Sequence, residues 1–183
     1  QIVTLERLFK TICNESLTSM VWRIPEVEDR LKFLTDQVER ITGLQEFGVY
    51  LNKLFTIDAI FLNEDRHMHN IAVMMNGKGE FDYCPIFDNG GALLTDTTMD
   101  YPLDQDELLL MKEVHAKTIS SDFDEQLDAS EHFYGRNLRF SFTKKDVERL
   151  LAKPELNMYD MRIRTRVTNI FYQQMNKYKY LFY

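Results

Sequence analysis

The chain contains little cysteine and no long apolar run, and each of these absences removes a class of protein. Only Cys13 and Cys84 occur in 183 residues, and they lie far apart in the sequence. No disulfide framework is therefore expected, and a reducing, cytoplasmic compartment is favoured. No apolar stretch approaches the ~18 residues needed to cross a bilayer, so we expect no membrane association. Glu6, Arg7 and Lys10 interrupt the first apolar residues, which argues against a signal peptide.

An excess of basic residues is also missing. The formal net charge is -7 and the pI is about 5.1, whereas proteins that bind nucleic acid broadly present a basic face. We therefore expect no direct nucleic-acid binding. Hydrophobic residues make up 44% of the chain and charged residues 28%, which is sufficient for one core in a single domain spanning residues 1–183.

A short polar break from Asn63 to Asn70 lies between two apolar runs. Within it, Asp65 and Asn70 are five positions apart, and Asp88 follows 18 residues after Asn70. Phosphoryl transfer from ATP needs a carboxylate at the acceptor hydroxyl and oxygen ligands for magnesium. Asp-x-x-x-x-Asn is the spacing of a kinase catalytic loop. The pattern therefore predicts Asp65 as the base and Asn70 with Asp88 as the metal ligands.

The second acidic residue can return beside the first pair only if the chain between them folds back. Residues 71–75 form a short apolar run and residues 81–84 alternate between polar and apolar side chains. Between them lies Asn76-Gly77, the strongest short-range signal for a β-hairpin turn. The sequence therefore predicts one hairpin at this place.

The order of these motifs resembles the HipA-like kinase family, whose Asp-Arg-His loop is similar to that of the phosphatidylinositol 3- and 4-kinases. The resemblance covers residues 63–94 almost throughout, and it extends to a run before the loop and a segment after it. The residues that carry it are Asp58-Ala59-Ile60-Phe61-Leu62, Asp65-Arg66-His67-x-x-Asn70, Pro85-Ile86-Phe87-Asp88-Asn89-Gly90 and Phe123-Asp124-Glu125-Gln126-Leu127.

The resemblance implies an ATP- and magnesium-dependent serine/threonine protein kinase. It implies a mainly α fold, a protein-kinase-like large lobe with one catalytic β-hairpin. Asp65, Arg66 and His67 would be the catalytic residues, with Asp65 as the catalytic carboxylate, and Asn70 and Asp88 would bind Mg2+ and, with it, ATP. Arg66 is expected to orient the loop or pair with a carboxylate, and His67 to pack under the loop. The resemblance also implies a protein substrate, a toxin-type role and an antitoxin-like partner.

The chain departs from the family in the part that precedes the loop. No glycine precedes Gly43, and the only Gly-x-Gly, at residues 77–79, lies in the predicted hairpin. Neither a phosphate-covering loop nor a strand lysine for the phosphates is recognisable. We therefore expect residues 1–183 to be a large lobe whose small lobe comes from upstream sequence or from another chain.

Two other functions remain open. One is a non-catalytic pseudokinase or protein-interaction module, which the missing phosphate-covering loop favours. The other is a metal-dependent hydrolase that uses His67 and His69 together with Asp65 and Asp88. Two histidines without a third local ligand make a weak metal site.

Apolar periodicity predicts helices over most of the remaining chain. Thr143 and Asp146 have the spacing of a capping box at a helix start. The acidic stretch at residues 89–106 is expected to be a loop. The expected helices are residues 2–12, 26–41, 44–62, 107–116, 123–134, 143–151 and 157–178.

Overall fold

The computed structural model describes all of residues 1–183 and is mainly α-helical. The strands of its one antiparallel sheet are β1 (Ile2–Thr4), β2 (Ala72–Met75) and β3 (Phe81–Tyr83). The helices are α1 (Leu5–Cys13), α2 (Leu17–Trp22), α3 (Val27–Thr42), α4 (Phe47–Phe61), α5 (Glu107–Glu113), α6 (Phe123–Tyr134), α7 (Lys144–Leu151) and α8 (Met161–Lys177). Short 3-10 turns lie at Pro154–Leu156 and Lys179–Leu181.

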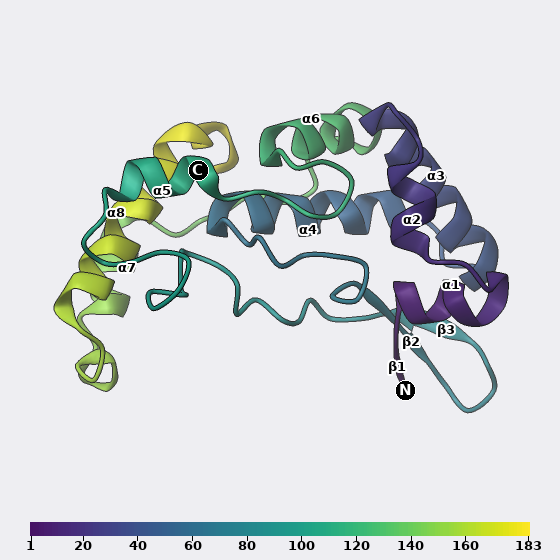
Figure 1. Ribbon diagram of the computed structural model, residues 1–183, viewed down its shortest axis with the longest axis horizontal. Helices are drawn as coiled ribbons and strands as arrows, with labels where there is room; N and C mark the ends of the chain where they lie inside the picture. Colours follow the sequence, from purple (N-terminus) through teal and green to yellow (C-terminus); the bar gives the residue numbers. More distant parts are fainter.

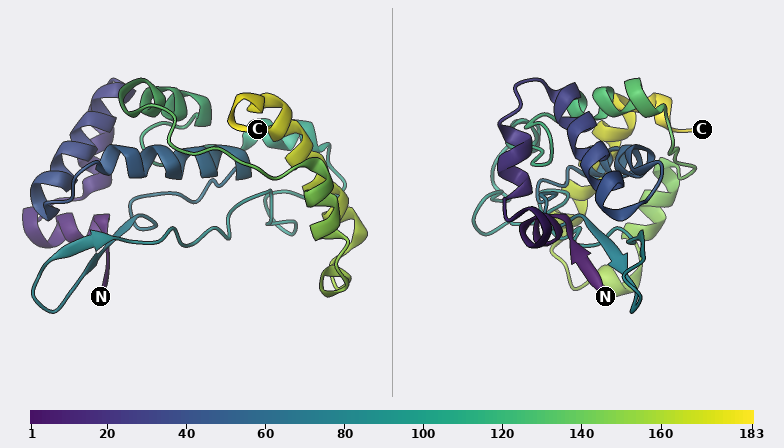
Figure 2. Two further views of the ribbon diagram at one scale, coloured as in Figure 1. Left: turned by 180° about the vertical axis from the view of Figure 1, so that it is seen from behind. Right: turned by 90° about the vertical axis from the view of Figure 1, so that its right-hand side faces the viewer.

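Helix α4 runs through the centre of the molecule (Figure 1). It is apolar nearly all round, and Leu51, Phe55 and Ile60 are fully buried, as expected for a helix covered on every side. Helix α6 packs along it, with α1–α3 at one end and α5, α7 and α8 at the other (Figures 1 and 2). The core is divided accordingly: one apolar cluster includes α4 as far as Phe55, and a second begins at Ala59.

The sheet is built on the predicted hairpin. Strand β2 pairs with β1 on one side and with β3 on the other. The Asn76 side chain closes the turn, because its Oδ1 accepts the backbone N–H groups of Lys78 at 2.8 Å and Glu80 at 3.0 Å. Asparagine is favoured in turns for this reason. The hairpin carries the chain from residues 63–70 back toward Asp88.

Several predictions from the sequence are confirmed. The hairpin, the two helices before residue 63 and the helix at residues 123–134 are all present, the last with the predicted bounds. The capping box at Thr143 and Asp146 is formed in both directions. Residues 89–106 contain neither helix nor strand.

The prediction of one helix over residues 2–12 was wrong at its start. Residues 2–4 form β1, because their backbone pairs with β2, far along the sequence. Such pairing is set by tertiary contacts, and three residues are too few to show the apolar periodicity of a helix or a strand. Thr4 then caps α1, where its side-chain oxygen accepts the N–H of Arg7 at 3.3 Å.

Two other helices differ by three residues from their predicted bounds. The helix expected from residue 44 begins at Phe47, and the helix expected to end at residue 116 ends at Glu113.

Two further differences lie at N-terminal caps. The short helix α2 was not predicted; it begins after Ser16, whose hydroxyl accepts the N–H of Ser19 at 3.2 Å. The last helix begins at Met161 and not at residue 157, because Asp160 caps it by accepting the N–H of Arg162 at 2.8 Å. A capping side chain fixes a helix start that apolar periodicity leaves vague.

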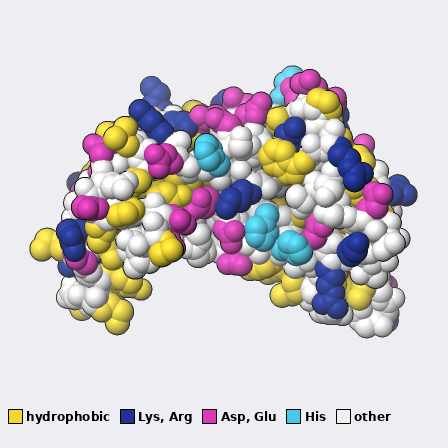
Figure 3. Space-filling model, in the orientation of Figure 1, with side chains coloured by type: hydrophobic (Ala, Val, Ile, Leu, Met, Phe, Trp, Pro, Cys, Tyr) yellow, Lys and Arg dark blue, Asp and Glu magenta, His cyan; other side chains and the backbone are white.

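The molecule has an arched outline, with a hollow along its lower edge between the hairpin end and the α7–α8 end (Figure 3). Residues 84–106 run beneath α4 on this side of the molecule (Figure 1). None of the helices combines the length and the apolar character required to cross a membrane.

A buried polar contact between α4 and α6 gives a test of this arrangement. The fully buried Asn52 donates from Nδ2 to the Ser130 hydroxyl at 3.0 Å and accepts the N–H of Asn137 at 3.1 Å. Asn52→Ala should lower the free energy of unfolding by about 2–4 kcal/mol, because it leaves buried partners unsatisfied. Lys53→Ala, at an exposed position of the same helix, should change it by less than ~0.5 kcal/mol. Equal denaturation midpoints for the two variants would contradict this account of the α4–α6 contact.

Candidate active site

The candidate site begins where α4 ends. Leu62 adopts a left-handed conformation with φ 49°, and its N–H and that of Asn63 both turn back to the carbonyl oxygen of Asp58. This cap stops the helix and directs the chain into the loop at residues 63–70. The Asp58 side chain, one turn before the helix end, is fully buried.

Asp58 forms a buried ion pair with Arg66 of the loop. Arg66 Nε lies 3.1 Å from Asp58 Oδ2, and the side chains are 1% and 0% exposed. The Asn63 amide donates to Asp58 Oδ1 at 2.9 Å. Burial raises the pKa of the Asp58 carboxyl, while the Arg66 guanidinium and the Asn63 amide favour its charged form. A buried charge persists only when it is paired and hydrogen-bonded, and here both conditions hold.

The other donors of Arg66 hold the two chain segments together. Nη1 donates to the carbonyl oxygens of Asn70 at 2.9 Å and Phe87 at 2.6 Å. Nη2 donates to the side-chain oxygen of Asn89. One guanidinium therefore joins the end of the loop to both neighbours of Asp88. Because Arg66 is buried and fully engaged, it both orients the loop and pairs with a carboxylate, the two expectations for it.

Asn70 and Asp65 are in direct contact. The Asn70 Nδ2 donates to the Asp65 carbonyl oxygen at 2.8 Å and to Asp65 Oδ2 at 3.2 Å. A carboxylate only accepts hydrogen bonds, so the amide nitrogen must face Asp65 and the amide oxygen is free for another partner. The Asp65 side chain remains 43% exposed, whereas Asn70 is buried. The predicted pair is therefore together, and Asp65 is its accessible member.

Asp88 follows β3, the second strand of the hairpin, and is exposed. Its φ of 52° is left-handed, a region that Asp tolerates better than most residues. The residues on both sides of it, Phe87 and Asn89, are held by Arg66. The backbone of Asp88 is therefore anchored beside the Asp65 loop, and its carboxylate is on the surface.

The chain after Asp88 passes very close to the loop. A Cβ atom added to Gly91 would lie 2.8 Å from the Cβ of Asp65. The Gly91 carbonyl accepts the N–H of Glu64 at 3.3 Å, and the Leu93 N–H donates to the Phe61 carbonyl at 2.8 Å. Leu93 and Leu94 have φ of 58° and 56°, and such conformations persist in branched residues only where the surroundings impose them.

The histidines do not behave as expected in every respect. His67 does not pack under the loop: its side chain is 37% exposed, with Nε2 3.5 Å from Asp65 Oδ1. Its Nδ1 accepts the backbone N–H of His69 at 3.2 Å, and this local turn holds the ring on the surface. No group of three or more His, Cys, Asp and Glu side chains is suitably placed to hold a metal ion. The hydrolase alternative therefore lacks a ligand set.

None of the larger cavities is lined by Asp65, Asn70 or Asp88. The one that reaches nearest, of about 240 Å³, is bordered by Asn63 and Asn89. Asp65 and Asp88 thus lie outside these cavities on the surface, whereas Asn70 is buried.

Sequence reasoning missed the residues that support the site. The resemblance includes Asp58 and Asn63 only as members of its motifs, and no sequence pattern points to Thr118, whose hydroxyl donates to the Arg66 carbonyl. Asp58 did carry a usable signal, because a single carboxylate in a helix that is otherwise apolar requires a buried partner. Thr118 carried none, since it lies 52 positions from Arg66.

Adjacent glycines allow a matched test of the close approach. Gly91→Ala would force its new Cβ against Asp65, whereas a Cβ at Gly90 has nothing within 4 Å. Gly91→Ala should lower the free energy of unfolding by about 1–3 kcal/mol, and Gly90→Ala should change it by less than ~0.5 kcal/mol. Chemical denaturation measures both. If the two variants are equally stable, the segment after Asp88 does not lie against the loop.

No protein-family model, no curated protein and no solved structure matches the chain. The likeness to the HipA-like kinases therefore rests on sequence motifs alone, among them those at residues 65–70 and 85–90. What this site does is inferred from the arrangement of its own side chains.

Proposed function

We propose that the chain is the large lobe of a HipA-like protein kinase and transfers a phosphoryl group from ATP to a serine or threonine of a protein. The observation that carries this proposal is the single guanidinium of Arg66, which holds Asn70 and both neighbours of Asp88, while Asn70 holds Asp65. Residues of the kinase pattern that are separated in sequence are thereby anchored to one group. Phosphoryl transfer depends mainly on such positioning.

Asp65 has the role of the residue that receives the hydroxyl proton of the substrate. Its side chain is exposed enough to meet a protein segment, and the Asn70 amide fixes its orientation. His67, 3.5 Å from the other carboxylate oxygen, stands beside it as a second group able to exchange a proton.

The donor set suits magnesium. The Asn70 amide oxygen is left free by the contact of its nitrogen with Asp65, and the Asp88 carboxylate is exposed. Arg66 holds the Asn70 carbonyl and both neighbours of Asp88. Amide and carboxylate oxygens are the ligands that magnesium takes in nucleotide sites, usually one or two together with phosphates. When bound with ATP, magnesium neutralises phosphate charge. These two residues would hold it.

A small lobe must cover the nucleotide, since a phosphate-covering loop and its lysine are not recognisable in this chain. We propose that it comes from upstream sequence or from a partner chain, and that it closes over the open surface at Asp65 and Asp88. A toxin-type role with an antitoxin-like partner follows from the family resemblance. The same missing loop favours one other candidate, a non-catalytic interaction module that keeps the fold of a kinase lobe.

Phosphoryl transfer measured with the full natural chain and its small lobe distinguishes a protein kinase from a non-catalytic interaction module. Asp65→Asn should reduce phosphorylation of a protein or peptide substrate by at least ~10²-fold, because base assistance is lost, and should leave ATP affinity unchanged. Asp82→Asn, at an exposed position of the hairpin that follows the loop, is the matched control and should retain full transfer. Undiminished transfer by Asp65→Asn would remove this residue from the mechanism.

Metal binding is tested separately with Mn2+ as a paramagnetic probe. In the wild type and in Asp82→Asn, Mn2+ with ATP should broaden the amide resonances of Asn70 and Asp88. Asp88→Ala should abolish this broadening without changing the rest of the spectrum, since its side chain is exposed. Failure of wild-type protein to bind nucleotide or Mn2+, even with a small lobe, would favour the interaction module.

A further inference from the structure

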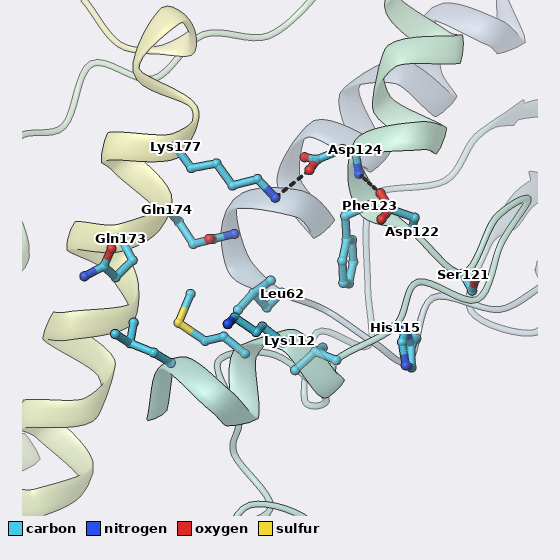
Figure 4. A pocket seen from close by; sticks show the side chains of 13 residues that line it. Leu62, Lys112, His115, Ser121, Asp122, Phe123, Asp124, Gln173, Gln174 and Lys177 are labelled. Carbon is cyan, nitrogen blue, oxygen red and sulfur yellow. Dashed lines mark hydrogen bonds and ion pairs between the residues drawn. The ribbon is translucent and has the colours of Figure 1, made fainter. Parts of the chain in front are cut away.

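One of the larger cavities is not lined by Asp65, Asn70 or Asp88. Its volume is about 550 Å³, and it is enclosed by α5, the start of α6 and the last turns of α8, with Leu62 beneath (Figure 4). Sites for small organic molecules have volumes of ~300–1,000 Å³. The cavity is therefore large enough to hold a ligand, and nothing in the phosphoryl-transfer proposal uses it.

One part of the cavity is apolar. Leu62, Val114 and Phe123 line it and are more than nine-tenths buried, and Met111 adds a half-buried side chain from α5. Phe123 extends into the space from the start of α6 (Figure 4). An aliphatic or aromatic body placed here would be removed from water, which contributes roughly 25 cal/mol for each Å² of apolar surface.

The two carboxylates of the cavity are already engaged. Asp122 caps α6 by accepting the N–H groups of Asp124 at 2.7 Å and Glu125 at 3.0 Å. Asp124 pairs with Lys177 at 2.7 Å and accepts the Tyr178 hydroxyl. Their negative charge is thereby compensated by helix N–H groups and by an ammonium group.

Lys112 has no such partner. Its ammonium group takes part in none of the ion pairs or hydrogen bonds of the chain, although it lines the same cavity near Leu62 (Figure 4). His115 adds a second nitrogen base at the rim. The formal charges of Asp122, Asp124, Lys112 and Lys177 cancel, and Lys112, which is exposed, is the lysine of the cavity that has no carboxylate partner. It lies next to the apolar wall.

We propose that this cavity binds a small organic anion with an extended apolar body, such as a medium-chain carboxylate. Lys112 pairs with the anionic group, and Leu62, Met111 and Phe123 cover the body. A cationic ligand would have to displace Lys177 from Asp124, and a neutral one would gain no ion pair with Lys112. The site does not depend on the proposed phosphoryl transfer.

The walls of the cavity are joined to the catalytic loop. Leu62 directly precedes Asn63, whose side chain bonds to Asp58 and to the N–H of Asp65. Thr118, which lies between the lining residues His115 and Ser121, donates to the Arg66 carbonyl. Bound ligand should therefore be detected at the amides of the loop as well as at those of the cavity.

Titration with octanoate, followed by ¹H–¹⁵N NMR of the full chain, tests the proposal. Octanoate should cause saturable shifts at the amides of Leu62, Met111 and Phe123. Lys112→Met keeps the length of the side chain and removes its charge, and it should weaken octanoate binding by at least ~10-fold, equivalent to about 1.4 kcal/mol. Lys117→Met removes an exposed lysine that does not line the cavity and should leave the affinity within about twofold of wild type by the same measure.

Octan-1-ol provides the matched neutral ligand. It should bind the wild type more weakly than octanoate does, and Lys112→Met should remove this difference. Equal octanoate affinity in wild type and Lys112→Met, or shifts that do not saturate and are scattered over the surface, would overturn the proposal. Neither outcome bears on phosphoryl transfer by Asp65, which is measured independently.

Discussion

The buried pair of Asp58 and Arg66 is the interaction on which the rest of the structure depends. Removing two charges from water costs several kcal/mol for each ion, and only complete hydrogen bonding offsets that cost. Arg66 meets this requirement because its planar fork reaches a carboxylate, two carbonyl oxygens and an amide oxygen at once. Asp58 also lies between the two apolar clusters that meet along α4. The pair thus links the boundary between the two apolar clusters to the surface where Asp65 is exposed.

The division of labour within the loop follows from burial. Arg66 is inside and fixes the backbone, whereas Asp65 is outside and free to meet another molecule. Asn70 connects the two roles, since its carbonyl is held from within and its amide holds Asp65. Glycine at position 91 completes the arrangement, because no side chain fits where the returning chain crosses Asp65.

Local signals in the sequence were sufficient to predict the hairpin, several helices and the pairing of Asp65 with Asn70. The Asn76-Gly77 turn, the capping box at Thr143 and the spacing of Asp65 and Asn70 each concern residues within one short segment, where turn and helix chemistry acts directly. What could not be predicted depends on partners far away: β1 exists only by pairing with β2, and Thr118 matters only because Arg66 lies beside it. The surface position of His67 was also missed, since burial in a loop is set by what the rest of the chain covers.

The partners of Arg66 have one more property in common: all of its side-chain contacts lie between residues 58 and 89, within 23 positions of it. By contrast, α8 reaches α4 through a contact of Gln174 with Ala59, 115 positions apart. The entropy lost on closing a loop grows with its length, and short-range contacts form sooner during folding. Closing the contacts of Arg66 therefore costs less chain entropy than docking α8 on α4, which joins residues 115 positions apart. The loop and hairpin of the candidate site are thus held together by the local part of the fold.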